Sequence, residues 1–195
     1  DTSGDNDQIT LSFGKDTIAG GAGTDRLVGD IDLRESTQFA KLDYLVNGNN
    51  LAWDTSYDRI TSALAGAATG YRIVLGSLGY SQTTGIEQYQ IDITGTNDTT
   101  TGDLLIYQNG TRYNGAGGLR DAFYANWSAV TTPIVWINDP QAIQLVNGVS
   151  VQGLERLVLS TGSGNDAISN PHANSGDDDI RTGPGADTVN GGPGD

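Results

Sequence analysis

The 195-residue chain contains no cysteine, no methionine and a single histidine, and only 10 of its residues are lysine or arginine. Without cysteine it forms no disulfide, so another device must hold its folded state together. No run of about 18 apolar residues occurs, which excludes a transmembrane helix, and we expect no signal peptide at its first residues. A His-Glu-x-x-His zinc motif and a Gly-x-x-x-x-Gly-Lys-Ser/Thr phosphate loop are both absent.

The charge is strongly one-sided, because 24 acidic residues face those 10 basic ones and give a formal net charge of −14. A polyanion of this kind is a poor partner for nucleic acid, and we expect neither nucleic-acid binding nor membrane insertion. Carboxylates that crowd together repel one another until a cation neutralises them. The composition therefore favours a chain that needs cations to fold.

One nine-residue pattern occurs three times at each end of the chain. At the N-terminal end, three aspartates lie nine residues apart and each is followed two residues later by an aliphatic residue: Asp7/Ile9, Asp16/Ile18 and Asp25/Leu27. At the C-terminal end, Gly-x-Asp-x-aliphatic occurs at Gly164–Ile168, Gly176–Ile180 and Gly185–Val189. This is the Gly-Gly-x-Gly-x-Asp-x-aliphatic-x nonapeptide of calcium-binding parallel β-helices.

The spacing explains the chemistry. Glycine permits the tight turns that point carbonyl oxygens at a common centre, aspartate adds a hard anionic oxygen, and the aliphatic residue starts a short strand with its side chain inward. Calcium takes roughly 6–8 oxygen ligands, which two stacked turns can supply. We predict several Ca²⁺ ions, held by Asp7, Asp16, Asp25, Asp166, Asp178, Asp187 and the turn glycines Gly14, Gly23, Gly164, Gly176 and Gly185.

Two nonapeptides make one coil, so aspartates that share an ion should lie 18 residues apart. Asp7 and Asp25 satisfy this rule and are predicted to face one ion. Asp16 would face position 34, which is Arg34, and its site is at best half complete.

In the C-terminal block, a three-residue bulge at 170–172 makes Asp166 and Asp187 the pair on one side. Asp178 would need an aspartate at position 196. The last residues, 191–195, stop within a repeat, so we expect the chain to be a segment of a longer array.

The terminal blocks resemble RTX repeats (repeats-in-toxin, the hemolysin-type calcium-binding β-roll) of secreted bacterial proteins. The close matches cover about residues 1–28 and 160–195, with departures at Asp5, at 12–13 and at 173–174. The resemblance implies calcium-driven folding and export by a type I secretion system, and therefore a secreted, extracellular or cell-surface location.

The segment between the blocks, residues 29–159, is rich in short β-type runs: 71–75, 86–93, 104–107, 134–137 and 154–159. Only 57–68 and 119–129 have a pattern that would allow a short helix. A faint duplication relates 84–98 to 152–166 and places Glu87 and Glu155 at equivalent positions, where each would cap backbone N–H groups.

We therefore expect an all-β fold with a parallel β-roll or β-solenoid at each end (1–28 and 160–195) and an irregular β-rich middle (29–159). Two structures for the middle stay open: a widened solenoid and an inserted β-sandwich. Two aliphatic series should form the narrow cores of the rolls: Ile9, Ile18 and Leu27, and Ile168, Ile180 and Val189.

Aromatic residues are concentrated in the middle segment, where aromatic side chains often fill an irregular β core. Alternatively, Tyr113, Tyr124 and Trp127, which lie among Gly, Asn and Arg, would form an exposed platform for sugar rings.

Three functions are compatible with this sequence. The favoured one is a non-enzymatic structural module of an adhesin, surface layer or surface filament, with neighbouring repeats or copies of the same protein as partners. The second is an accessory module that binds polysaccharide for an extracellular enzyme. The third, a hydrolase or lyase that uses pairs of Glu or Asp in the middle segment, is the least favoured.

Overall fold

The computed structural model describes residues 4–11, 14–32, 42–46, 49–51, 53–65, 72–75, 79–86, 88–94, 104–107, 110–115, 120–172 and 176–194. In these ranges the regular elements are strands, apart from the helix α1 (Tyr57–Ala65). The expectation of an all-β fold is therefore confirmed.

The largest sheet has six strands, in the order β1 (Gln8–Thr10), β3 (Arg26–Asp32), β8 (Gln88–Thr94), β10 (Arg112–Asn114), β14 (Val149–Gln152) and β13 (Gln144–Val146). Neighbouring strands within this sheet are parallel, except for β13 and β14, which form an antiparallel hairpin. Ile9 lies beside Leu27, which is the 18-residue step that the nonapeptide coil predicts.

Two further sheets are wholly parallel. One contains β9 (Leu104–Ile106), β11 (Ala122–Asn126), β15 (Arg156–Ser160) and β17 (Asp179–Arg181), and the other contains β12 (Val135–Ile137), β16 (Ala167–Ser169) and β18 (Thr188–Asn190). Ile168 lies beside Val189 in the second of these sheets. The C-terminal coil thus spans 21 residues, as the predicted three-residue bulge requires.

The fourth sheet contains an antiparallel insertion. Its order is β2 (Gly14–Ala19), β7 (Gly79–Thr84), β6 (Arg72–Leu75), β4 (Leu42–Val46) and β5 (Asn49–Asn50). Only β2 and β7 are parallel to each other. Because β2 pairs with β7, the residue beside Asp16 is Ser81 rather than the predicted position 34, and Arg34 itself lies outside the described residues.

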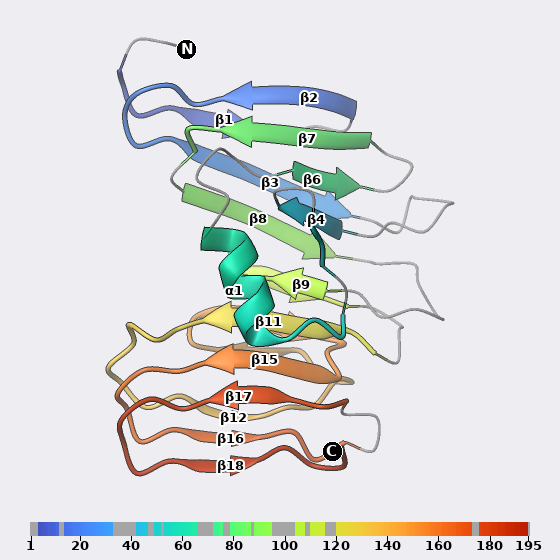
Figure 1. The fold of residues 1–195 in the computed structure, drawn as a ribbon, viewed down its shortest axis with the longest axis vertical. Helices are drawn as coiled ribbons and strands as arrows, with labels where there is room; N and C mark the ends of the chain where they lie inside the picture. The colour runs from blue at the N-terminus through green and yellow to red at the C-terminus, as the bar shows by residue number, and fades with distance from the viewer. Residues whose placement is uncertain are drawn as a thin grey trace.

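The strands lie across the long axis of the molecule, with β1 and β2 near one end of that axis and β18 near the other (Figure 1). The helix α1 lies against one side of the stack at the level of β9 and β11, where the rings of Tyr57 and Tyr124 are 5.2 Å apart.

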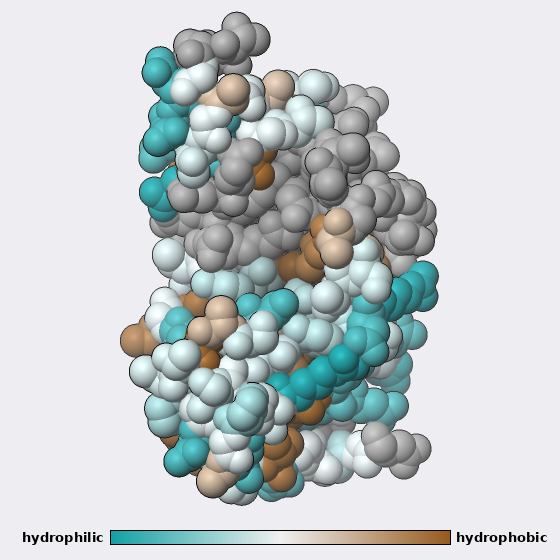
Figure 2. Space-filling model, turned by 60° about the vertical axis from the view of Figure 1, so that its left-hand side comes forward, coloured by the Kyte–Doolittle hydropathy of each residue, from teal (hydrophilic) through white to brown (hydrophobic). Residues whose placement is uncertain are grey.

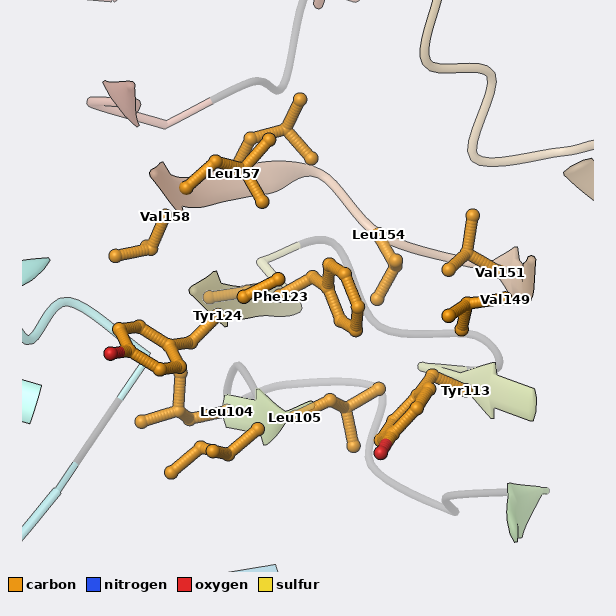
Figure 3. Close-up of a cluster of buried hydrophobic side chains, with 14 of the residues drawn as sticks. Leu104, Leu105, Tyr113, Phe123, Tyr124, Val149, Val151, Leu154, Leu157 and Val158 are labelled. Atoms are coloured by element: carbon orange, nitrogen blue, oxygen red, sulfur yellow. The ribbon is translucent and has the colours of Figure 1, made fainter. Parts of the chain in front are cut away.

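The core is largest in the middle of the stack, where the strands β9, β11 and β15 are buried on both faces. Figure 3 shows Phe123 and Leu105 on one side of these strands, together with Tyr113 and Val151, and Tyr124 and Val158 on the other side. A strand that is buried on both faces reads as a continuous apolar run instead of an alternating one. Leu104–Ile106 and Leu157–Leu159 are runs of this kind.

Most local predictions for the middle segment are confirmed. The predicted runs 71–75, 104–107 and 134–137 contain the strands β6, β9 and β12, and α1 lies within 57–68. The runs 86–93 and 154–159 overlap β8 and β15, each of which extends one residue further. The allowance for a helix at 119–129 is wrong, because β11 occupies it. Parallel pairing with β9 and β15 on both sides outweighs the weak local preference for a helix.

The alternative interpretation of the aromatic residues, an exposed platform for sugar rings, is also wrong. Tyr113, Tyr124 and Trp127 are only 2%, 2% and 3% exposed. Tyr113 packs edge-on against Phe123 with ring centroids 5.3 Å apart. These rings therefore form part of the core, as the first interpretation of the aromatic residues predicts.

The two aliphatic series are buried to different degrees. Leu27 and Ile168 are fully buried, and Ile9, Ile18 and Ile180 are partly buried against the core. Val189 is 47% exposed, because β18 is an edge strand with only β16 beside it.

The surface is mainly hydrophilic or neutral on the face shown in Figure 2, where hydrophobic residues form small separate patches. Among the residues whose side chains the structure describes, the other large apolar side chains that are exposed lie on β12, on β13 and just before β13: Val135, Ile137, Ile143 and Leu145. In the part of the chain that the structure describes, no helix is long and apolar enough to span a membrane.

Candidate metal centre

Five of the six predicted metal-binding aspartates stand immediately before a strand. Asp7 precedes β1, Asp25 precedes β3, Asp166 precedes β16, Asp178 precedes β17 and Asp187 precedes β18. These positions are the corners at which the chain turns into a new strand. Asp16 differs, because it lies inside β2.

At the N-terminal corner, the chain holds two successive coils together with a reciprocal set of hydrogen bonds. The Asp25 carboxylate accepts a hydrogen bond from the backbone N–H of Asp7 at 2.8 Å, and the Asn6 side-chain oxygen accepts one from the N–H of Thr24 at 2.8 Å. The backbone N–H of Arg26 donates to the carbonyl of Asp7. We call this arrangement the corner clamp.

The C-terminal block repeats the corner clamp in every bond. Asp187 accepts from the N–H of Asp166 at 2.8 Å, and Asn165 accepts from the N–H of Ala186 at 3.0 Å. The N–H of Thr188 donates to the carbonyl of Asp166. The two predicted aspartate pairs, Asp7/Asp25 and Asp166/Asp187, are therefore in adjacent coils at both ends of the chain.

Further carboxylates cap the coils in between. Asp166 accepts from the N–H of Ile134 at 2.8 Å, and Glu155 accepts from the N–H of Asp121 at 2.8 Å. The predicted capping role of Glu155 is confirmed, whereas Glu87 lies outside the described residues. The corner residue Asp121 was missed by the sequence reasoning, although Asp121-Ala-Phe123 carries the same Asp-x-apolar ending as the repeats.

Asp178 belongs to a different corner from Asp166 and Asp187. It accepts a hydrogen bond from the N–H of Leu157 at 2.8 Å and from the side-chain amide of Asn170. Its carboxylate therefore contacts β15, in the preceding coil. Burial raises the pKa of Asp178 to about 6, although these hydrogen bonds act in the opposite direction. Neutralisation by a cation would favour its ionised form.

Two of the corner carboxylates are fully buried, and their burial bears on whether the corner can hold a cation. Asp25 is 0% exposed and Asp166 is 1% exposed. The second carboxylate oxygen of Asp166, Oδ2, is buried without a hydrogen-bond partner in the described part of the chain. A buried carboxylate is costly unless it is paired or coordinates a metal. Residues 160–195 contain six aspartates but only one Lys or Arg, Arg181, so the block itself supplies little positive charge.

The turn glycines bring oxygens of successive coils close together. A Cβ atom on Gly185 would lie 2.0 Å from the carbonyl oxygen of Gly164 and 2.8 Å from Asp187 Oδ1. A Cβ on Gly23 would lie 2.2 Å from the carbonyl oxygen of Asp5. The hard oxygen donors that calcium prefers therefore meet beside these glycines.

The other predicted glycines have different roles. A Cβ on Gly164 would lie 2.7 Å from the backbone of Pro133, so close packing requires this glycine. A Cβ on Gly176 would meet nothing nearer than the Trp53 ring at 3.5 Å, which is an ordinary contact. Gly14 begins β2 beside Gly79.

Across the described ranges, acidic side chains and His172 do not gather in groups of three or more that would hold a metal ion. A calcium ion at a corner clamp would therefore need backbone carbonyl oxygens in addition to Asp25, or to Asp166 and Asp187. The residues present fit calcium in this sense: buried carboxylates, nearby carbonyls and glycines that leave space.

Comparison with known families gives one match. A family model for the RTX calcium-binding nonapeptide repeat matches residues 1–32 and 172–195, in four copies. The matched ranges include five of the predicted aspartates and leave out Asp166. No curated protein sequence matches the chain, and neither does any solved structure.

Proposed function

Since the chain carries RTX calcium-binding repeats at both ends, we propose that it is a structural calcium-binding module of a secreted or cell-surface bacterial protein, and that it folds on binding extracellular calcium. The parent protein would be an adhesin, a surface layer or a surface filament that leaves the cell by type I secretion. The module itself would have no enzymatic activity.

The observation that carries the proposal is the corner clamp, which is the same in both terminal blocks. Each clamp places buried or partly buried aspartates of successive coils next to one another. Such an arrangement brings negative charges together in a chain whose net charge is already −14. A divalent cation from solution relieves that repulsion and stabilises the folded state.

Calcium, when bound, would supply the positive charge that the repeats lack. Its binding free energy would then be part of the folding free energy, as it is in other metal-dependent folds. Asp25 and Asp187 would hold the N–H groups of the preceding coil with one oxygen and face the ion with the rest of the carboxylate. The same residues would thereby couple the metal to the register of the coils.

For the architecture, we propose one continuous β-solenoid, with the β-rolls 1–28 and 160–195 joined by a widened middle at 29–159. Parallel pairs link the blocks to the middle, as between β3 and β8 and between β12 and β16. This pairing favours the widened solenoid over an inserted sandwich. The antiparallel strands β4–β6 would then be an insertion into one coil.

The partners would be neighbouring repeats or copies of the same surface protein. The exposed apolar side chains of β12 and β13, among them Val135, Ile137 and Leu145, are where such a contact would bury apolar area. For polysaccharide binding, the three aromatic residues first considered are buried, and no observation favours that role.

The test is a calcium titration of the chain from a chelated start, followed by circular dichroism and isothermal calorimetry, with magnesium as the control. We expect a cooperative gain of β signal with calcium and little change with magnesium, which demands stricter octahedral geometry. A chain that is fully folded in chelator and releases no heat with calcium would refute the proposal.

A further inference from the structure

The inserted segment 53–65, here called the strap, lies against the C-terminal repeat although more than 100 residues separate them. The clearest link is Arg156, which is only 5% exposed. Its guanidinium donates to the carbonyls of Trp53 and Thr55 in the strap, at 2.7 and 3.1 Å, and to the carbonyl of Asp177 in the repeat, at 2.7 Å. One buried cation thus joins three backbone oxygens from the two segments.

The repeat also holds the start of the strap's helix. Asp179 accepts a hydrogen bond from the backbone N–H of Tyr57, the first residue of α1, at 2.9 Å. This N–H has no partner inside the helix, and a carboxylate is favourable at a helix N-terminus. Arg181 lies over the Tyr57 ring, 4.6 Å from its centre, and pairs with Asp58 at 2.6 Å.

These contacts come from the residues on either side of a candidate calcium ligand. Asp178 points toward β15 and caps Leu157, while its neighbours Asp177 and Asp179 contact Arg156 and the strap. Successive residues of a strand point to opposite faces. Residues 176–181 therefore form a corner on one face and the docking surface for the strap on the other. If these residues become ordered, both features form together.

The strap covers apolar surface. Ile60 is fully buried, and Thr61 and Tyr124 share a hydrogen bond of 2.9 Å between their hydroxyl oxygens. The outer face of β9, β11 and β15, which includes Tyr124 and Val158, lies beneath this part of the chain (Figures 1 and 3). Undocking of the strap would expose this face to water, at a cost in hydrophobic free energy.

We propose that the strap is calcium-controlled: it docks when calcium orders the C-terminal repeat, and it detaches from that repeat when calcium is removed. This inference rests on the proposed function. It makes the repeat both a metal site and a docking surface for a distant segment. Because coupling between two binding equilibria is reciprocal, strap docking must in turn raise the calcium affinity of residues 176–181.

Hydrogen exchange of the full chain, measured by mass spectrometry across a calcium titration, tests whether calcium controls the docking of the strap. Amides of 57–65 and of 176–181 should gain protection together, with one calcium midpoint, and magnesium should not replace calcium. A strap that stays protected in chelator while 176–181 exchange freely would overturn the inference. Calorimetry separates the two ideas: absence of calcium binding refutes the proposed function, whereas binding with an unchanged strap refutes the coupling alone.

Variants of the strap that keep every candidate calcium ligand test whether strap docking raises the calcium affinity of residues 176–181. Tyr57→Ala removes the ring contacts to Tyr124 and Arg181, and should weaken calcium binding at 176–181 about fivefold or more, which is the lower end of typical coupling. Asp58→Ala removes only the exposed ion pair and should weaken it about twofold. Arg59→Ala, exposed on the same helix, is the matched control.

The N-terminal repeat, read at 23–28 in the same experiment, is the internal reference, and its midpoint should stay constant in all three variants. An unchanged midpoint at 176–181 in both Tyr57→Ala and Asp58→Ala would contradict the inference. An equal shift in Arg59→Ala would contradict it as well, since helix stability rather than docking would then explain the effect. If Tyr57→Ala prevents folding, Asp58→Ala still decides the outcome.

Discussion

Replacement of Asp166 by asparagine and by alanine separates the structural role of a corner carboxylate from its role toward calcium. One oxygen of Asp166 caps the N–H of Ile134 at 2.8 Å, and the other is buried without a hydrogen-bond partner in the described residues. Asparagine keeps an oxygen acceptor and removes the charge. Alanine removes both.

In chelator, the two substitutions should affect the free energy of unfolding differently. Asp166→Ala leaves the N–H of Ile134 unpaired, and Ile134 is only 4% exposed, so we expect a loss of about 1–3 kcal/mol in the free energy of unfolding. Asp166→Asn retains the cap and removes a buried negative charge, which is unfavourable without a counter-ion. It should be as stable as the wild type, or more stable.

With calcium present, the wild type should be more stable than either variant. A charge-assisted interaction of a buried carboxylate contributes about 1.5–3 kcal/mol, which corresponds to a roughly 10- to 150-fold lower calcium affinity for both variants. Asp166→Asn should therefore lose the calcium-dependent gain in stability although its calcium-free fold is intact.

Urea unfolding followed by tryptophan fluorescence, in chelator and in saturating calcium, measures the free energy of unfolding of the wild type and of both variants. If Asp166→Asn is destabilised as much as Asp166→Ala in chelator, the capping argument fails. If Asp166→Asn gains as much stability from calcium as the wild type, Asp166 is a structural cap and not a calcium ligand.

Three further predictions follow from other positions. Gly185→Ala places a Cβ 2.0 Å from the carbonyl oxygen of Gly164 and should destabilise the calcium-loaded chain by about 1–3 kcal/mol. The control Gly176→Ala should change the free energy of unfolding by no more than about 0.5 kcal/mol. Equal effects of the two variants in thermal melts would refute the close packing at Gly185. Burial raises the pKa of Glu155 above its ordinary value of 4.5, so stability in chelator should fall as the pH rises from 4.5 through the raised pKa. Glu155→Gln should make this fall shallower in pH-dependent urea titrations, because the raised pKa of Asp178 contributes to it as well, and an unchanged slope would contradict the assignment. Phe123→Ala, at a fully buried position, should cost about 3–5 kcal/mol, and a loss below about 1 kcal/mol in urea unfolding would place Phe123 outside the core.

Much of the candidate site was predictable from sequence because the repeats are local. An aspartate followed two residues later by an aliphatic residue, at a period of nine, identifies the corner and the first inward side chain of the strand. The pairs Asp7/Asp25 and Asp166/Asp187 followed from that period and from the bulge at 170–172, and both lie in adjacent coils. One hydrogen bond of each corner clamp is accepted by the side chain of Asn6 or of Asn165, and no spacing rule indicated the roles of these two residues.

The period failed where the chain leaves the repeat. Asp16 lies beside Ser81 because strand pairing passes over the intervening residues and joins β2 to β7. A sequence window contains no information about which distant strand will complete a sheet edge. For the same reason, the local pattern of residues 119–129 allowed a helix. Phe123 and Tyr124 instead belong to the strand β11, which lies between β9 and β15.

The all-β class and the corners of the terminal repeats follow from local sequence, since each depends on residues within one or two nonapeptides of one another. Tertiary structure alone decided which face of the middle strands the strap covers, and that Arg156 and Asp179 hold it. These contacts join residues more than 100 positions apart, and their formation depends on burial and backbone hydrogen bonding in the assembled coils.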